Sequence, residues 1–177
     1  MAFIVESFPL PPDMHAELST LFDRYYSYLK SVREDMPQNA YSFAIADWHY
    51  DHTDPKCPHD SWLETLIVRE PSSGERGERR QVEIRVELLG AFHDGHIELR
   101  YPGVRSYLLQ GPRNLDRSAG VSEGHGDWMI DEVRLSDKDI VLHEVKFSGG
   151  SRWTIESEDI VYRWKPFESL RGSRNNL

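Results

Sequence analysis

The chain has 177 residues, of which 38% are hydrophobic and 29% charged, and its formal net charge is −9. A chain of this length normally forms one domain with a sizeable core, and the composition excludes a disordered protein. The acidic balance argues against a general nucleic-acid binder, which usually carries a basic face. It fits either a solvated protein without a charged partner or one that binds a basic protein.

The cysteine content and the N-terminus bear on the compartment. Cys57 is the only cysteine, so no intrachain disulfide can form, which favours a reducing environment. The opening residues MAFIVESFPLPP hold a short apolar run that Glu6 interrupts, and they lack the basic start of a signal peptide. No run approaches the roughly 20 apolar residues of a membrane span. We therefore expect a cytoplasmic protein without a membrane partner.

The first part of the chain is expected to be mainly helical. Residues 3–8 predict a short strand, followed by a helix from about Asp13 to Asp35 that Asp13 can cap. A second, shorter helix around Ala40 completes a helical segment over 13–46. Apolar side chains recur at three- and four-residue steps, and we expect this stripe to pack on a sheet. The stripe consists of Leu18, Leu21, Phe22, Tyr25, Leu29 and Val32.

A polar stretch, DWHYDHTDPKCPHD over 47–60, follows the helices. Its prolines predict a loop. The loop holds His49, His52, Cys57 and His59, but their spacing does not match the two separated ligand pairs of known zinc sites. A solvated loop is one interpretation. In the other, the loop folds over a nearby hairpin, where His59 or Asp60 completes a metal site.

From Trp62 onwards, alternating apolar residues predict about seven antiparallel strands in a meander over 62–165. Pro102-Gly103 is expected to turn the chain inside this region. A three-residue loop, 149–151, should pair Phe147 with Trp153. Residues 167–177 form a polar tail. The predicted fold is therefore a single α+β domain over 1–166, in which the N-terminal helix covers one face of the meander sheet.

The best-defined element is the hairpin over 81–110. Asp94-Gly95 is typical of a two-residue type I′ turn, because both central positions need positive φ. With that turn, His93 faces His96 and Leu88 faces Tyr101, so that apolar side chains share one face.

The predicted register opposes His93 and His96, with Glu98 following on the same polar face as Glu83, Arg85, Glu87 and Arg100. Directly opposed residues have Cβ atoms about 5 Å apart, so both imidazoles reach one small cation. Two histidines and a carboxylate suit zinc or a similar divalent metal. The alternative is that polar residues at a hairpin tip are simply exposed to solvent.

Two further histidines lie outside the hairpin and the 47–60 loop. His125 lies between glycines and precedes Asp127, and both residues either point towards a shared site or shape a tight entry into the next strand. His143 alternates with apolar residues and is expected to be a hydrogen-bonded core histidine. The chain contains no nucleotide-binding, serine-hydrolase or metalloprotease motif.

Three segments carry a resemblance: HDSWLE at 59–64, GAFHDGHIE at 90–98 and GDW at 126–128. In these segments the chain resembles small β-rich bacterial proteins of unknown function, some of which are similar to immunity proteins. The resemblance covers roughly 48–165, and it implies a protein that neutralises a toxin by binding it. It assigns no catalytic residue.

Two functions from different classes follow. The first is a non-enzymatic, immunity-like binding protein without a cofactor, whose acidic surface docks a basic protein partner. The alternative is a metal-dependent hydrolase-type site on the hairpin, with zinc or another divalent metal that activates a water molecule. Its ligands would come from His93, His96 and Glu98, with His59, Asp60, His125 or Asp127 nearby.

Overall fold

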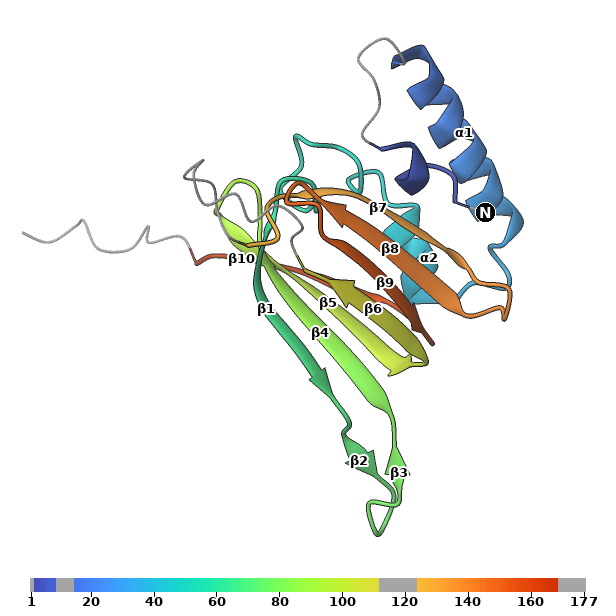
Figure 1. Cartoon of the computed structure of the whole chain (residues 1–177), viewed down its shortest axis with the longest axis vertical. Coiled ribbons are helices and arrows are strands. Elements are labelled where there is room, and N and C mark those ends of the chain that lie inside the picture. Colours follow the sequence, from blue (N-terminus) through green and yellow to red (C-terminus); the bar gives the residue numbers. More distant parts are fainter. Residues whose placement is uncertain (1, 9–14, 112–123, 169–177) are drawn as a thin grey trace, which may run out of the picture.

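The computed structural model describes residues 2–8, 15–111 and 124–168 (Figure 1). The predicted start of the first helix at Asp13, most of the loop at 111–126 and the tail from 169 lie outside these ranges. The helices are η1 (Val5–Ser7, a 3₁₀ turn), α1 (His15–Ser31) and α2 (Gln38–Ala44).

The strands form two four-stranded sheets and a short ribbon, all antiparallel. The first sheet contains, in spatial order, β1 (Trp62–Arg69), β4 (Val82–Leu89), β5 (Gly95–Val104) and β10 (Val161–Pro166). The second sheet contains β6 (Ser106–Gln110), β9 (Arg152–Ser157), β8 (Val141–Phe147) and β7 (Trp128–Leu135). The ribbon of β2 (Ser72–Ser73) and β3 (Arg79–Arg80) extends beyond β1 and β4 (Figure 1).

The α+β class is confirmed, but the single meander of seven strands is wrong, because the described chain forms ten strands in three sheets. The reason lies partly at Pro102-Gly103, which does not turn the chain back. Gly103 has φ +57°, and the register shifts between Val82 and Ile84 on the neighbouring strand. This bulge bends β5, and after Arg105 the chain continues as β6 in the second sheet.

Backbone hydrogen bonds join the two sheets on both sides. At the bulged corner, Arg105 N–H donates to Glu156 O (2.9 Å) and Glu158 N–H to Pro102 O (3.1 Å). At the start of β1, Trp128 N–H donates to Ser61 O (3.0 Å) and Asp60 N–H to Trp128 O (2.9 Å). The sheets therefore form a sandwich that is closed at these two places.

The core lies between the two sheets, where the apolar faces of the strands meet. The first sheet supplies Ile84, Val86, Leu88, Ile97, Leu99 and Tyr101, and the second supplies Trp128, Val145, Phe147, Trp153 and Ile155. Tyr101 also bonds across the core, with its hydroxyl 2.8 Å from Nδ1 of His143. His143 is fully buried, which confirms the prediction of a hydrogen-bonded core histidine.

Helix α1 supports the edge strand β7 with tyrosine hydroxyl groups. The Tyr25 hydroxyl donates to Val133 O (2.9 Å) and accepts from Val133 N–H (3.0 Å). The Tyr28 hydroxyl accepts from Leu135 N–H (2.7 Å). These bonds satisfy backbone groups that another strand would otherwise pair with, so α1 blocks this edge against aggregation.

The predicted strand over 3–8 is wrong, because this segment contains η1. The buried carboxylate of Glu132 accepts the consecutive N–H groups of Phe3, Ile4 and Val5 at 2.6–3.2 Å. An extended strand would point consecutive amides to opposite sides, whereas a helical turn brings them to one acceptor. This carboxylate therefore fixes the N-terminal segment on the second sheet.

Candidate functional site at the hairpin end

The β4–β5 hairpin closes with a wider turn than the sequence predicts. Gly90 N–H donates to Gly95 O (3.0 Å) and His93 N–H to Gly90 O (2.8 Å), so four residues separate the two glycines. His93 adopts the positive φ of +54°. The ring of Trp164 explains this geometry, because a Cβ on Gly90 or Gly95 would lie 3.0 or 2.5 Å from it. The indole fills the space at the base of a tight turn.

The wider turn separates the predicted metal ligands. Leu88 pairs with Ile97 instead of Tyr101, a shift of four residues, and His96 pairs with Leu89 instead of His93. His93 lies in the turn, with its ring 4.7 Å from that of Trp62. Glu98 forms an ion pair with Lys165. The predicted set of His93, His96 and Glu98 is therefore not brought together.

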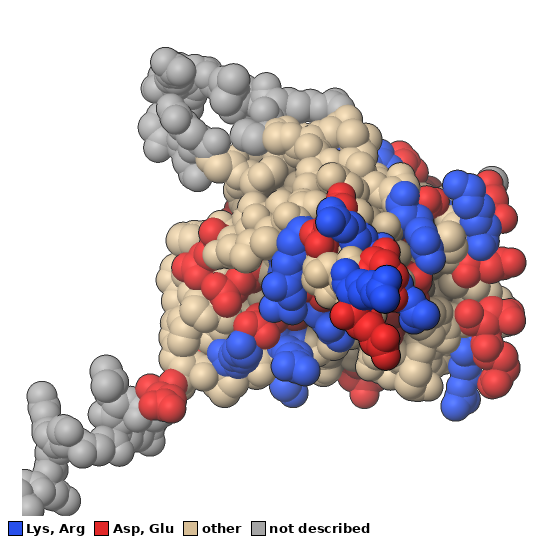
Figure 2. Space-filling model, turned by 90° about the horizontal axis from the view of Figure 1, so that it is seen from below, with Lys and Arg blue, Asp and Glu red and all other residues tan. Residues whose placement is uncertain are grey.

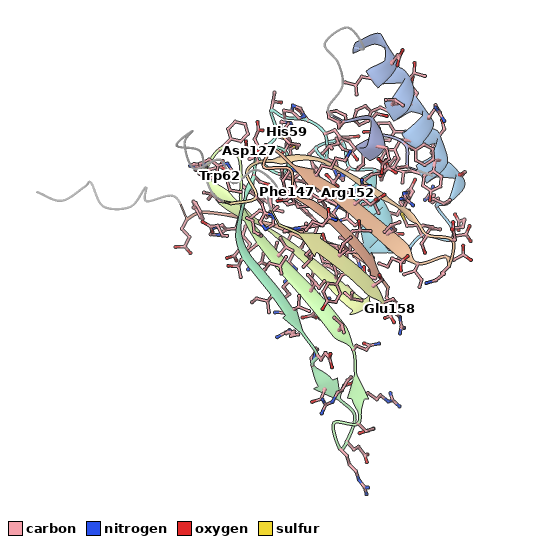
Figure 3. The ribbon with its side chains drawn as sticks, in the orientation of Figure 1. His59, Trp62, Asp127, Phe147, Arg152 and Glu158 are labelled. Atoms are coloured by element: carbon pink, nitrogen blue, oxygen red, sulfur yellow. The ribbon has the colours of Figure 1, made fainter. Side chains whose placement is uncertain are left out.

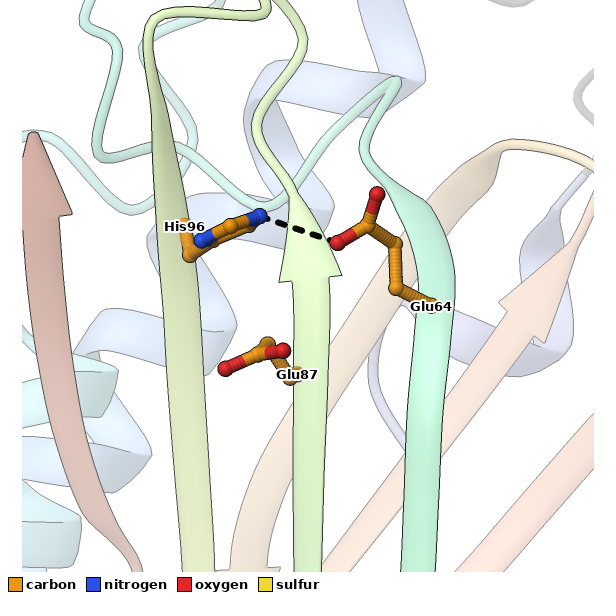
Figure 4. A group of neighbouring side chains, drawn as sticks. All are labelled: Glu64, Glu87 and His96. Carbon is orange, nitrogen blue, oxygen red and sulfur yellow. Dashed lines mark ion pairs between the residues drawn. The ribbon is translucent and has the colours of Figure 1, made fainter. Parts of the chain in front are cut away.

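His96 instead lies in a different cluster, with Glu64 and Glu87 (Figure 4). The three side chains come from the adjacent strands β5, β1 and β4, and one potential ligand atom from each lies within 4.8 Å of the others. Nε2 of His96 is 2.9 Å from Oε2 of Glu64, an ion pair that passes over the intervening strand.

Glu64 lies at a β-bulge in β1. Leu63 pairs with Leu88 and Thr65 with Glu87, so Glu64 is the extra residue between two regular pairs. Bulges commonly re-aim a side chain and occur often beside functional sites. The bulge leaves Glu64 outside the regular pairs and brings Thr65, instead of Glu64, opposite Glu87.

The outer face of the first sheet also forms a groove of about 500 Å³. Arg85 pairs with Arg100 and Glu87 with Glu98, so two like-charged pairs lie next to each other on this face, with the Val86–Leu99 pair between them. The end of the molecule that carries β2 and β3 shows Lys and Arg side chains interspersed with carboxylates (Figure 2). The groove is lined by Thr65, Ile67, Arg85, Val86, Glu87, Glu98, Leu99, Arg100, Val161 and Arg163.

Glu83 balances the arginines of this face. Its carboxylate lies 2.7 Å from Arg69 and Arg85 and 3.6 Å from Arg100. Partial burial opposes ionisation, but the hydrogen bonds from Arg69 and Arg85 hold the pKa of Glu83 below its ordinary value. Glu87, in contrast, forms no ion pair with any residue that the structure describes.

Exposed aromatic side chains surround the same end of the hairpin. Trp62, Phe92 and Phe167 are 48%, 54% and 46% exposed. Trp62 contacts the His93 ring, and the Phe167 ring lies 4.8 Å from that of His96. Phe167 N–H also donates to Asp94 O (2.7 Å). We call these three side chains the aromatic patch.

His59 and Asp60 do not join the Glu64–Glu87–His96 cluster. Nδ1 of His59 lies 3.1 Å from Oδ1 of Asp60, and the His59 ring stacks on His52 at 3.9 Å. Asp60 has φ +62° and donates its N–H to Trp128 O. His59 lies near Trp62 in the connection that leads into β1 (Figure 3).

His125 and Asp127 hold the entry into β7. Nδ1 of His125 lies 2.7 Å from the Ser151 hydroxyl, and burial lowers the pKa of this histidine. Asp127 accepts a hydrogen bond from Nε1 of Trp62 (2.7 Å), next to which it lies in Figure 3. These contacts favour the interpretation in which His125 and Asp127 shape the entry into β7. Asp127 also holds the Trp62 side chain of the aromatic patch.

The sequence analysis did not predict the buried network around Asp131. Oδ2 of Asp131 lies 2.9 Å from Nε2 of His49 and 2.9 Å from Nε2 of His143, while Oδ1 accepts from Nε1 of Trp128 (3.0 Å). Nδ1 of His49 lies 2.8 Å from Phe43 O, so it must carry a proton. Nε2 of His49 faces the Asp131 carboxylate, so both ring nitrogens of His49 point at hydrogen-bond acceptors.

The loop over 47–60 is correspondingly less solvated than predicted. His49 is 1% and Cys57 2% exposed. Burial raises the pKa of the Cys57 thiol to about 12, which makes it a poor nucleophile and a poor metal ligand. The charged Asp131 inside the apolar β7 pattern was the available signal for a buried partner, because such a carboxylate needs hydrogen-bond donors.

No protein-family model, curated protein or solved structure matches the chain. Among the residues that the structure describes, no helix is long and apolar enough to cross a membrane.

Proposed function

We propose that the chain is a non-enzymatic, immunity-like protein-binding domain that docks a basic protein through the aromatic patch. The observation that carries the proposal is the exposure of Trp62, Phe92 and Phe167 in one place. Large aromatic side chains supply much of the binding energy in protein interfaces, and Trp is among the residues most enriched there.

The surroundings of the patch suit a basic partner. Glu64 and Asp60 have side chains that are 43% and 59% exposed, and Asp127 contacts Trp62 directly. A polar rim around an apolar centre is the usual anatomy of an interface. The net charge of −9 would also accelerate the approach of a cationic protein and make the association sensitive to salt.

The test is a binding comparison between patch variants and a matched control. Extract of the native host is passed over the immobilised protein, and the recovered protein is identified and its affinity measured. We expect a basic protein whose affinity falls by roughly 30-fold or more with Trp62→Ala, as for a hot-spot residue. The affinity should also fall as salt rises.

Leu108→Ser provides the control, because Leu108 is equally apolar and 56% exposed but lies on β6 in the other sheet. It should leave the affinity unchanged. Equal recovery of the partner by wild type and by the Trp62→Ala, Phe92→Ser double variant would overturn the proposal. So would binding that does not respond to salt.

A further inference from the structure

The Glu64–Glu87–His96 cluster offers the right donor atoms for a cation. We propose that these three residues bind one divalent metal ion of the zinc class. The inference goes beyond the proposed function, because it requires no protein partner. It also replaces the ligand set predicted from the sequence, of which His96 alone remains.

The charges around Glu87 support a bound cation. Glu87 lies directly opposite Glu98 on the neighbouring strand, and like charges in such a pair repel each other. Lys165 neutralises Glu98, and His96 contacts Glu64, whereas Glu87 has no ion pair with any described residue. A metal ion between the carboxylates of Glu64 and Glu87 would remove this imbalance.

The geometry needs only a small side-chain adjustment. Ligand atoms about 2 Å from one metal lie up to about 4 Å apart, against 4.8 Å at most in this cluster. His96 and Glu64 are already within 2.9 Å, and the half-exposed Glu64 side chain is free to rotate. Glu87 also lines the groove, which leaves room for water as a further ligand.

The donor types indicate the class of metal. An imidazole nitrogen with two carboxylate oxygens suits Zn²⁺ or Mn²⁺, whereas Ca²⁺ and Mg²⁺ prefer sites made of oxygen alone. Zinc binding needs an unprotonated imidazole, so protons compete with the metal and the affinity should weaken as the pH falls.

The experiment titrates zinc chloride into the whole, tag-free protein at pH 7.5 by calorimetry and by competition with a coloured chelator. We expect one zinc per chain with micromolar affinity. His96→Ala should weaken binding by at least tenfold, and Glu87→Gln should weaken it comparably. Both side chains lie on the outer face of the sheet, so both variants should fold, and circular dichroism verifies this.

His93→Ala is the matched control, since His93 lies three residues from His96 but outside the cluster. It should leave zinc affinity unchanged. As a second readout, zinc should raise the thermal unfolding midpoint of the wild type and not that of His96→Ala. The proposal is overturned if the wild type binds no zinc at 100-micromolar levels (about 10⁻⁴ M). Equal binding by His96→Ala, or tighter binding of Ca²⁺ than of zinc, overturns it as well.

Discussion

At the scale of single residues, Asp131 carries the largest expected effect on stability. Its carboxylate is buried and accepts hydrogen bonds from His49, His143 and Trp128. Replacing the carboxylate with an amide removes the charged acceptor that these three buried side chains share. In asparagine, an NH2 group also replaces one of the two carboxylate oxygens. If this group takes the place of Oδ1, two donors, the NH2 group and the Trp128 N–H, face each other.

We therefore expect Asp131→Asn to lower the free energy of unfolding by about 3 kcal/mol, as for a buried pair that loses one partner. Urea denaturation measures the change. Asp137→Asn makes the same chemical change at an exposed position after β7 and should alter stability by less than about 0.5 kcal/mol. Equal effects of the two substitutions would show that the network contributes nothing specific.

The same carboxylate predicts a dependence of stability on pH. Burial opposes ionisation of Asp131, but His49 and His143 outweigh it and lower its pKa well below the ordinary value. A group with a lowered folded pKa stabilises the fold fully above its unfolded pKa, about 4, and loses this contribution as the pH falls further. Wild-type stability should therefore drop steeply below pH 4, and the drop should be shallower in Asp131→Asn.

At the scale of elements, the hairpin turn depends on contact between glycine and Trp164. A Cβ on Gly95 would lie 2.5 Å from the Trp164 ring and 2.6 Å from Lys165 O. We expect Gly95→Ala to destabilise the protein by about 1–3 kcal/mol through overpacking, measured by thermal and chemical denaturation. Gly111→Ala is the control, because no atom lies within 4 Å of a Cβ there. A neutral Gly95→Ala would mean that Trp164 does not determine the turn.

The hairpins also show which part of an element the sequence determines. The predicted pairings are shifted by four residues in β4–β5, and by two in β8–β9, where Val145 pairs with Trp153. Both shifts are even, so each side chain keeps its predicted face. Alternation specifies the face, because an odd slip would bury polar residues, but it does not distinguish registers that differ by two. In β4–β5, the packing of Trp164 against Gly90 and Gly95 selects the observed register.

The candidate cluster was only partly predictable for the same reason. His96 was recognised because it lies on the polar face of a clear hairpin. Glu64 reaches it from β1 across an intervening strand, through a bulge that pattern alone does not reveal. Placing Glu87 beside His96, and excluding His93, required the correct register. Asp131 was missed because its partner His49 lies 82 residues away in a loop.

At the scale of the whole molecule, two chain connections link the two sheets at one corner. The chain passes from β5 to β6 and from β9 to β10 at one bent corner, and the Tyr101–His143 hydrogen bond joins the sheets through the core. Separate unfolding of one sheet would break the paired strands of the other at this corner. The sandwich therefore cannot lose one sheet and keep the second intact.

We accordingly expect a single cooperative unfolding transition in urea. Tryptophan fluorescence reports on five tryptophans, of which Trp128 and Trp153 are fully buried in the core, whereas far-ultraviolet circular dichroism reports on all strands and helices. Coincident curves from the two probes would establish two-state behaviour. Tyr101→Phe removes the bond between the sheets, and it should shift both curves together to lower urea because the corner still couples the sheets. Two separated transitions in the wild type would show that the sheets fold as independent units.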